Sequence, residues 1–207
     1  MSNQELVKQL VTDGVLKSPH LIDAFQHINR ADFVPKELAD QAYINAPLPL
    51  GFGQTISQPL TVAFMLELLQ PAPGDNILDI GSGSGWQTAL LACLVGPAGK
   101  ITALEIVPEL YEQSIKNISR YDFIKRGAVR MLCANATAGL AAAAPFDKII
   151  AAAELAEIPP AWLNQLKIGG RLVAPIGHSL TLIIKKGEGQ LDRREFPGFV
   201  FVPFVTS

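Results

Sequence analysis

From Gly74 onward, short apolar segments alternate with segments of helical periodicity, and this alternation restricts the possible folds more than any other feature of the sequence. Strands separated by helices form βαβ units, in which neighbouring strands run parallel and helices cover both faces of the sheet. The pattern therefore predicts an α/β fold with a doubly wound, mostly parallel sheet. The predicted strands are Asn76–Ile80, Lys100–Ile106, Val129–Cys133, Lys148–Ala151 and Arg171–Pro175, and the predicted helices are Trp86–Val95, Pro108–Arg120 and Pro160–Leu166, the last ending at Gly169-Gly170.

The two ends of the chain depart from this alternation. Near the C-terminus, Leu180–Lys185 and Phe199–Phe204 have no helix between them, so we expect them to pair antiparallel at one edge of the sheet. Near the N-terminus, Gln4–Val11 is predicted to be helical, and further helices begin at Ser18-Pro19 and at Ser57-Gln58-Pro59. The 207 residues fit one domain, in which residues 1–70 supply N-terminal helices and a substrate-side loop that pack on a core of residues 74–207.

Composition excludes several classes of protein. Hydrophobic residues make up 49% of the chain and charged residues 17%, a balance that a disordered chain does not have. The apolar runs are interrupted by Glu67 and by Gly96-Pro97, so none approaches the roughly 18 residues of a membrane-spanning helix. The net charge of −2 and the lack of a basic cluster argue against a nucleic-acid partner.

The histidines and cysteines do not predict a metal site. The 3 histidines lie far apart in the sequence and have no metal-ligand spacing. Cys93 and Cys133 stand in apolar surroundings, which predicts buried, reduced thiols of the kind found in cytosolic proteins. Residues 1–10 lack the basic stretch and apolar core of a secretory signal, which also favours a cytoplasmic location.

A glycine-rich segment, Gly81-Ser82-Gly83-Ser84-Gly85, follows the first predicted strand at the position where doubly wound sheets bind ligands. Its third glycine comes one residue earlier than in a dinucleotide fingerprint, and no Gly-Lys-Ser/Thr follows, so the pattern favours a nucleoside ligand without a pyrophosphate. The next strand ends at Glu105, 24 residues after Gly81, where a carboxylate can accept hydrogen bonds from ribose hydroxyls. S-adenosyl-L-methionine satisfies both features, and the alternative is a structural turn with a solvated carboxylate.

Two segments carry a family resemblance. Pro47–Pro59, with the sequence PLPLGFGQTISQP, and Asp79–Gln87 closely resemble the protein-L-isoaspartate O-methyltransferase family, which belongs to the Rossmann-like class I methyltransferases. The resemblance spans roughly Ala24 to Phe204. It continues through Ala144–Asp147, Ile158–Pro160, Gly169–Val173 and Phe201–Phe204.

The resemblance implies transfer of a methyl group from S-adenosyl-L-methionine to the α-carboxyl group of L-isoaspartyl residues, with S-adenosyl-L-homocysteine as the product. Such residues arise spontaneously in ageing proteins, and their esterification begins repair. The implied partners are isoaspartyl peptides and proteins, met by a cytoplasmic enzyme. The sequence does not determine the oligomeric state, and a monomer is favoured over an oligomer. By family position Ser57 is the catalytic hydroxyl, and the implied cofactor-binding residues are Gln54, Thr55, Asp79, Gly81, Ser82, Gly83, Ser84, Gly85, Glu105, Ile106, Asn135 and Ala136.

Three of these residues also have structural interpretations. Ser57 precedes a predicted helix, so its hydroxyl would serve equally well as the helix N-cap. Asp79 would either face the sulfonium of the cofactor or brace the glycine turn. Trp86, which follows the glycines, is predicted to pack in the core rather than against a ligand.

The sequence also departs from the family pattern. Ala134-Asn135-Ala136 replaces the usual Gly-Asp-Gly, so Asn135 keeps an acceptor oxygen near the adenine position but lacks the charge. Glu154 places an extra carboxylate after the fourth strand. Two alternatives therefore remain: a methyltransferase of the same fold with another carboxylate or small-molecule acceptor, and a non-enzymatic module with a degenerate pocket.

Overall fold

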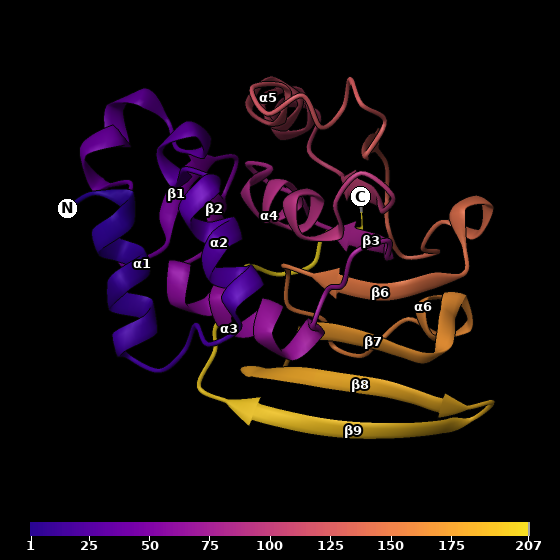
Figure 1. Ribbon diagram of the computed structural model, residues 1–207. Helices are drawn as coiled ribbons and strands as arrows, with labels where there is room; N and C mark the ends of the chain where they lie inside the picture. The colour runs from indigo at the N-terminus through magenta and orange to yellow at the C-terminus, as the bar shows by residue number, and fades with distance from the viewer. Residues whose placement is uncertain (207) are drawn as a thin grey trace.

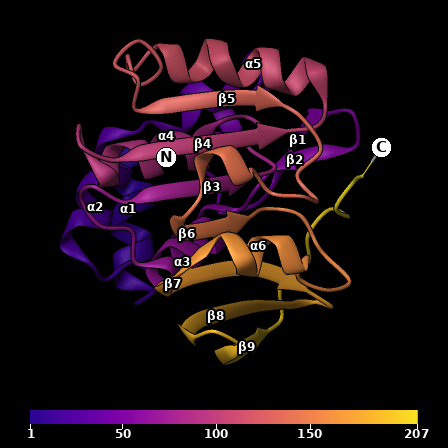
Figure 2. The same ribbon diagram turned by 90° about the vertical axis from the view of Figure 1, so that its right-hand side faces the viewer.

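The computed structural model describes residues 1–206, and its centre is a 7-stranded sheet of order β5-β4-β3-β6-β7-β8-β9 (Figures 1 and 2). β3 to β7 run parallel to one another, whereas β8 pairs antiparallel with both of its neighbours. The predicted doubly wound, mostly parallel sheet with an antiparallel pair at the C-terminal end is therefore confirmed. The strands are β3 (Asn76–Ile80), β4 (Lys100–Glu105), β5 (Val129–Cys133), β6 (Phe146–Ala151), β7 (Leu166–Ile176), β8 (Ser179–Gly187) and β9 (Gln190–Pro197).

Helices cover both faces of this sheet. Figure 2 shows α6 in front of the sheet and the N-terminal helices behind it. Ile150 of β6 faces the cluster formed with the N-terminal helices, whereas its neighbours Ile149 and Ala151 face the cluster around Trp162 of α6, as expected for alternating side chains on a strand. The helices are α1 (Asn3–Thr12), α2 (Pro19–His27), α3 (Pro59–Leu69), α4 (Trp86–Val95), α5 (Pro108–Ser119) and α6 (Pro160–Gln165), with 3-10 turns η1 (Arg30–Phe33), η2 (Lys36–Gln41) and η3 (Ala141–Ala143).

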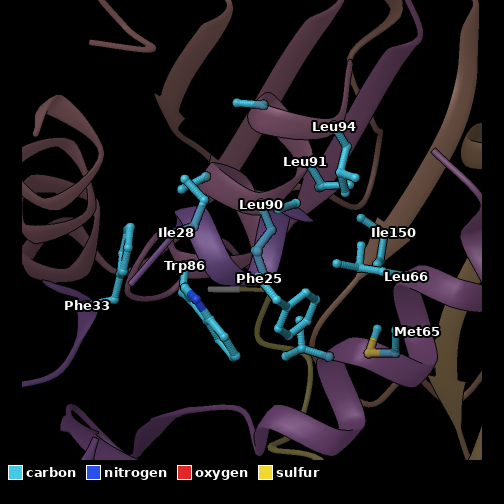
Figure 3. Packing of buried hydrophobic residues seen from close by; sticks show 14 of the residues in the cluster. Phe25, Ile28, Phe33, Met65, Leu66, Trp86, Leu90, Leu91, Leu94 and Ile150 are labelled. Atoms are coloured by element: carbon cyan, nitrogen blue, oxygen red, sulfur yellow. The ribbon is translucent and has the colours of Figure 1, made fainter. Parts of the chain in front are cut away.

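The N-terminal helices share one hydrophobic cluster with the sheet. Phe25 of α2 contacts Trp86 of α4 edge to face, with 5.6 Å between the ring centroids, and Met65 and Leu66 of α3 lie beside Ile150 (Figure 3). Trp86 is only 2% exposed, which confirms the prediction that it packs in the core. Through this shared cluster the N-terminal residues are held against the helix that follows the glycine-rich segment.

The C-terminal strand pair differs in its residues from the prediction. The partner of β8 is β9, not Phe199–Phe204, which forms no strand apart from a bridge at Pro203. β9 lies at the sheet edge with most residues exposed, and edge strands carry charges that discourage aggregation. Its charged run Asp192–Glu195 lacks the apolar residues by which a strand is predicted from sequence. Beyond it, Gly198 adopts a positive φ of 98° and donates its N–H to the His178 carbonyl oxygen, and the chain then pairs with Glu154 at Val202.

Other boundaries and burials also differ. Gly169-Gly170 lies inside β7 rather than at the end of a helix. A Cβ on Gly170 would stand 2.9 Å from the Asp147 carbonyl oxygen of β6, so glycine here permits the close approach of the two strands. The segment before Ser57 forms an antiparallel hairpin of β1 (Leu48–Gly51) and β2 (Gln54–Ile56), in which Leu48 and Leu50 are buried and Phe52 is exposed. Cys133 is exposed at the end of β5 and Cys93 is half-buried, so the prediction of two buried thiols was wrong.

Within residues 1–206, no helix is both long and apolar enough to cross a bilayer.

Candidate active site

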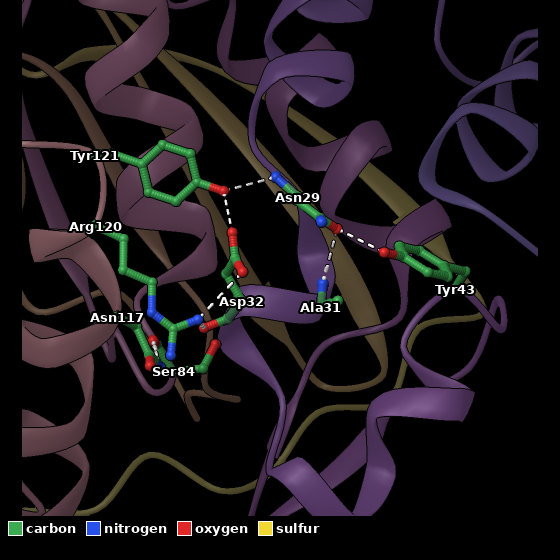
Figure 4. Close-up of polar contacts among 8 residues, drawn as sticks. All are labelled: Asn29, Ala31, Asp32, Tyr43, Ser84, Asn117, Arg120 and Tyr121. Carbon is green, nitrogen blue, oxygen red and sulfur yellow. Dashed lines mark hydrogen bonds and ion pairs between the residues drawn. The ribbon is translucent and has the colours of Figure 1, made fainter.

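The glycine-rich segment forms a tight turn between β3 and α4. Gly81, Gly83 and Gly85 have positive φ angles of 75°, 53° and 87°, which glycine adopts without strain. A Cβ on Gly85 would lie 2.9 Å from the Ile118 side chain, so this glycine also lets α4 and α5 approach closely. Asn117 of α5 donates to the Ser84 carbonyl oxygen at 3.0 Å and fixes the turn from the same side (Figure 4). The segment is therefore held by α5 as well as by its own backbone.

Glu105 ends β4 with its carboxylate directed into this turn. One oxygen, Oε2, accepts from the Gly83 backbone N–H at 2.8 Å. The other, Oε1, accepts from the backbone N–H groups of Ile106 and Val107 at 2.9 and 3.0 Å. The residue is 5% exposed, so the carboxylate is buried but bound by three donors. A carboxylate can accept about four hydrogen bonds, which leaves one acceptor position on Oε2 for a ligand hydroxyl.

Asp79 lies behind the turn rather than in the pocket. Its carboxylate accepts from Gln87 Nε2 at 2.8 Å and from Thr88 Oγ1 at 2.6 Å, and the residue is fully buried. Burial raises the pKa of Asp79 to about 6, with a contribution from nearby Glu105, while the two hydrogen bonds oppose the rise. The geometry therefore corresponds to the bracing interpretation, in which Asp79 ties β3 to the first turn of α4.

We expect the stability of the wild-type protein to depend on the protonation of Asp79. Because the folded protein holds this proton more tightly than the unfolded chain, the Asp79 carboxyl stabilises the fold below its ordinary pKa of 3.8, and that contribution is lost as the pH rises through about 6. Between about pH 5 and about pH 7.5 the wild type should lose about 1.4 kcal/mol of unfolding free energy relative to Asp79→Asn, measured by urea denaturation.

The control for this measurement is Asp122→Asn, which makes the same substitution at an exposed carboxylate. Asp122 has a positive φ, which asparagine also tolerates, so the substitution does not strain the backbone. This variant should follow the wild type across the whole pH range. Parallel pH profiles for the wild type and Asp79→Asn would contradict a buried carboxyl that retains its proton into the weakly acidic range.

Ser57 follows β2, and its hydroxyl is not a helix cap. α3 begins at Pro59 with Gln58 at the N-cap position, and Asn45 accepts from the Leu60 backbone N–H at 3.0 Å. Within residues 1–206 the Ser57 hydroxyl makes no hydrogen bond. The capping interpretation was therefore wrong, because a side chain from an earlier loop takes that role. The hydroxyl is left available in the wall of the pocket.

One pocket brings most of the predicted residues together. Ser57 lies in the same wall as the turn and Glu105, but Asp79, Gly85 and Asn135 do not line the pocket. Asn135 is exposed, accepts from the Thr137 backbone N–H and donates to the Thr206 carbonyl oxygen. The predicted residues that line the pocket are Gln54, Thr55, Ser57, Gly81, Ser82, Gly83, Ser84, Glu105, Ile106 and Ala136.

The C-terminal segment forms another part of the wall, to which the sequence assigned no binding residue. Residues 202–205 cross the carboxyl ends of the strands, and their backbone pairs with Glu154 through two hydrogen bonds of 2.8 Å. Phe204 packs edge to face against Trp162 of α6. Trp86 and Gln87 belong to the wall as well, so Trp86 serves both the core and the pocket.

The donor and acceptor groups of this wall fit a nucleoside cofactor. The Ser82 hydroxyl and the Trp86 indole N–H are both buried and have no hydrogen-bond partner within the described residues. Buried polar groups are normally paired, so two unpaired groups in one pocket wall indicate a polar ligand. Together with the free acceptor position on Glu105, they match a ligand with ribose hydroxyls and an amino-acid tail. Among residues 1–206 no cluster of three or more His, Cys, Asp or Glu side chains could hold a metal ion.

Comparisons with known proteins agree with this geometry. A relative from Methanopyrus kandleri, "Protein-L-isoaspartate O-methyltransferase", is 38% identical over 99% of this chain and 91% of the relative. One of the same name from Aeropyrum pernix is 40% identical over 97% of this chain and 78% of the relative. A Plasmodium falciparum protein, described as a protein-L-isoaspartate O-methyltransferase and solved with S-adenosyl-L-homocysteine, has 23% identity and a TM-score of 0.91, with both chains fully covered. That structure supports the shared fold.

The fold and the pocket define the class, a doubly wound methyltransferase that uses S-adenosyl-L-methionine. The protein-L-isoaspartate(D-aspartate) O-methyltransferase family model matches residues 1–207. The chain belongs to this family, and its activity is that of a protein carboxyl O-methyltransferase acting on isoaspartate.

Proposed function

We propose that Ser57, the glycine turn and Glu105 perform methyl transfer to isoaspartyl carboxylates, and that the reaction serves the repair of damaged proteins in the cytoplasm. The observation that carries the residue assignment is the single pocket in which a free hydroxyl faces the same space as the turn and the strand-end carboxylate. The pocket draws on residues from 54 to 205, which supports the view that the whole chain acts as one unit. Asp79 and Gly85 support the cofactor side indirectly, by bracing the turn.

The chemistry requires little from acid or base groups. An α-carboxyl group has a pKa of roughly 3 to 4, so the acceptor is ionised at neutral pH and needs no general base. Within residues 1–206, Glu105 is the only Asp, Glu, His, Lys or Arg in the pocket wall, and its carboxylate is bound by backbone donors. When bound, the cofactor supplies an electrophilic methyl group on a positively charged sulfur.

This chain's residues contribute alignment and exclusion of water. Ser57 would donate its hydroxyl to one oxygen of the acceptor carboxylate and leave the other oxygen free to attack. Opposite charges are neutralised during the transfer, so an environment with little water favours the transition state. Val202, Phe204 and the hairpin residue Ile56 provide apolar parts of the pocket wall. Positioning alone supplies effective molarities on the order of 10⁵–10⁸ M in well-aligned systems.

The test is methyl transfer from labelled S-adenosyl-L-methionine to an isoaspartyl peptide, with the peptide that contains normal aspartate as control. We expect a base-labile label on the isoaspartyl peptide alone, because methyl esters hydrolyse in base. Label on neither peptide, in protein that binds S-adenosyl-L-homocysteine, would identify a different acceptor. Failure to bind S-adenosyl-L-homocysteine at millimolar concentration would instead indicate a degenerate pocket.

A further inference from the structure

Arg30, the first residue of η1, is fully buried beside the pocket wall. Its Nη1 donates to the carbonyl oxygens of Ala42 at 2.6 Å and Ile44 at 3.4 Å. Its Nη2 donates to the carbonyl oxygens of Ala46 at 3.0 Å and Ser57 at 3.1 Å. All four terminal N–H donors of the guanidinium are thus bound to backbone carbonyls.

The charge of Arg30 has no acidic partner in the described part of the chain, since no ion pair there includes it. Burial lowers the pKa of Arg30 to about 10, so the side chain is still charged at neutral pH. A buried, unpaired charge is costly, and a hydrophobic residue would fill the same space at lower cost. The four carbonyl contacts and a Trp86 ring whose centroid lies 5.3 Å from the guanidinium carbon compensate for the lost hydration.

These contacts join three segments, two of which contribute Ser57 and Trp86 to the pocket wall. Residues 42–46 precede β1, Ser57 follows β2, and Trp86 begins α4 after the glycine turn. The clamped loop also contains Asn45, which caps α3 in place of Ser57. Arg30 therefore fixes the backbone of Ser57 directly, through the Ser57 carbonyl oxygen. Asn45, in the clamped loop, caps α3 and so leaves the Ser57 hydroxyl without a capping role.

We infer that Arg30 is a positioning residue for the acceptor side of the pocket, which acts by holding the backbone of Ser57 so that its hydroxyl points at the substrate carboxylate. This inference rests on the proposed function of Ser57. A planar guanidinium presents its donors in a fixed fork, whereas a lysine ammonium has three donors on a flexible stem. Arg30→Lys keeps the charge but cannot reproduce the four-carbonyl clamp.

A double-mutant cycle with Ser57→Ala separates this role from a purely structural one. In the wild-type background, Arg30→Lys should lower kcat/KM for an isoaspartyl peptide about fivefold to tenfold. Here kcat/KM is expressed per binding site, as counted by titration with S-adenosyl-L-homocysteine. In the Ser57→Ala background the same change should lower it less than about twofold, because the hydroxyl that Arg30 positions is gone. Affinity for S-adenosyl-L-homocysteine should fall less than kcat/KM, since the glycine turn and Glu105 are untouched and Arg30 reaches the cofactor side only through its contact with Trp86.

Lys185→Met is the matched control. Lys185 is another buried cation bound to backbone carbonyls, those of Leu163 and Leu166 at 3.0 Å, and it lies on β8 outside the pocket wall. The Lys185→Met variant should have a lower melting temperature than the wild type. Its kcat/KM per titrated site should be unchanged in both the wild-type and the Ser57→Ala backgrounds. If Arg30→Lys lowered kcat/KM by the same factor in both backgrounds, the inference about Arg30 would be overturned and the proposed function would stand. A wild type that methylates no isoaspartyl peptide would overturn the proposed function together with it.

If Arg30→Lys does not fold, Asn45→Ala provides a second cycle. This variant releases the clamped loop from α3 and leaves the guanidinium in place. Its loss of kcat/KM should likewise shrink in the Ser57→Ala background, and equal losses in both backgrounds would again overturn the inference.

Discussion

Glu105→Ala should weaken binding of S-adenosyl-L-homocysteine at least about a hundredfold, measured by titration calorimetry. The carboxylate accepts three backbone N–H groups, one of them from Gly83 inside the glycine turn. Hydrogen bonds to charged groups contribute about 1.5–3 kcal/mol each, and a loss of about 2.7 kcal/mol already corresponds to a hundredfold change. The alanine variant loses the acceptor for the ligand and also the group that holds Gly83 in place.

Glu109→Ala is the control for this measurement. Glu109 is an exposed carboxylate in the first turn of α5, four positions beyond Glu105, and it does not line the pocket. Its removal should leave the affinity unchanged. We expect turnover of Glu105→Ala at saturating S-adenosyl-L-methionine to fall less than its affinity, because the acceptor side is intact. Normal affinity with a large loss of turnover would show that Glu105 does not hold the ribose.

The cofactor side could be predicted from sequence because its parts are local. The glycine turn and the strand-end carboxylate each depend on residues within one βα unit, and the parallel sheet places them at the same edge. The chemistry of a buried carboxylate was harder to predict. Three backbone donors already bind Glu105, so the hydrogen bonds from ribose hydroxyls expected from the motif reduce to one, at the remaining acceptor position on Oε2.

The rest of the site depends on contacts between residues distant in sequence, which leave no local pattern. Asn45 caps a helix that starts 14 positions later, and Arg30 reaches the Ser57 carbonyl across 27 positions. The bridge between Glu154 and Pro203 brings the C-terminal segment to the pocket, although its apolar residues alone had suggested a strand. Periodicity identifies which residues are apolar, and tertiary contacts decide whether they form an edge strand or a pocket wall.

Ser57→Ala should slow methylation of an isoaspartyl peptide about tenfold to a hundredfold, because one hydrogen bond to a charged group contributes about 1.5–3 kcal/mol. The free energy of unfolding should stay within about 0.5 kcal/mol of the wild type, since the hydroxyl has no partner within residues 1–206 and Asn45 supplies the cap. Affinity for S-adenosyl-L-homocysteine should be retained. Kinetics, urea denaturation and calorimetry on one preparation check these three expectations together.

Ser2→Ala provides the opposite pattern. The Ser2 hydroxyl accepts from the Glu5 backbone N–H in a capping box at the start of α1, outside the pocket wall. Its loss should cost about 1 kcal/mol of stability with turnover unchanged. If Ser57→Ala behaved like Ser2→Ala, the hydroxyl would be structural and another group would have to orient the acceptor. A stable, cofactor-binding but slow Ser57→Ala protein would instead separate orientation of the acceptor from every other contribution of the pocket.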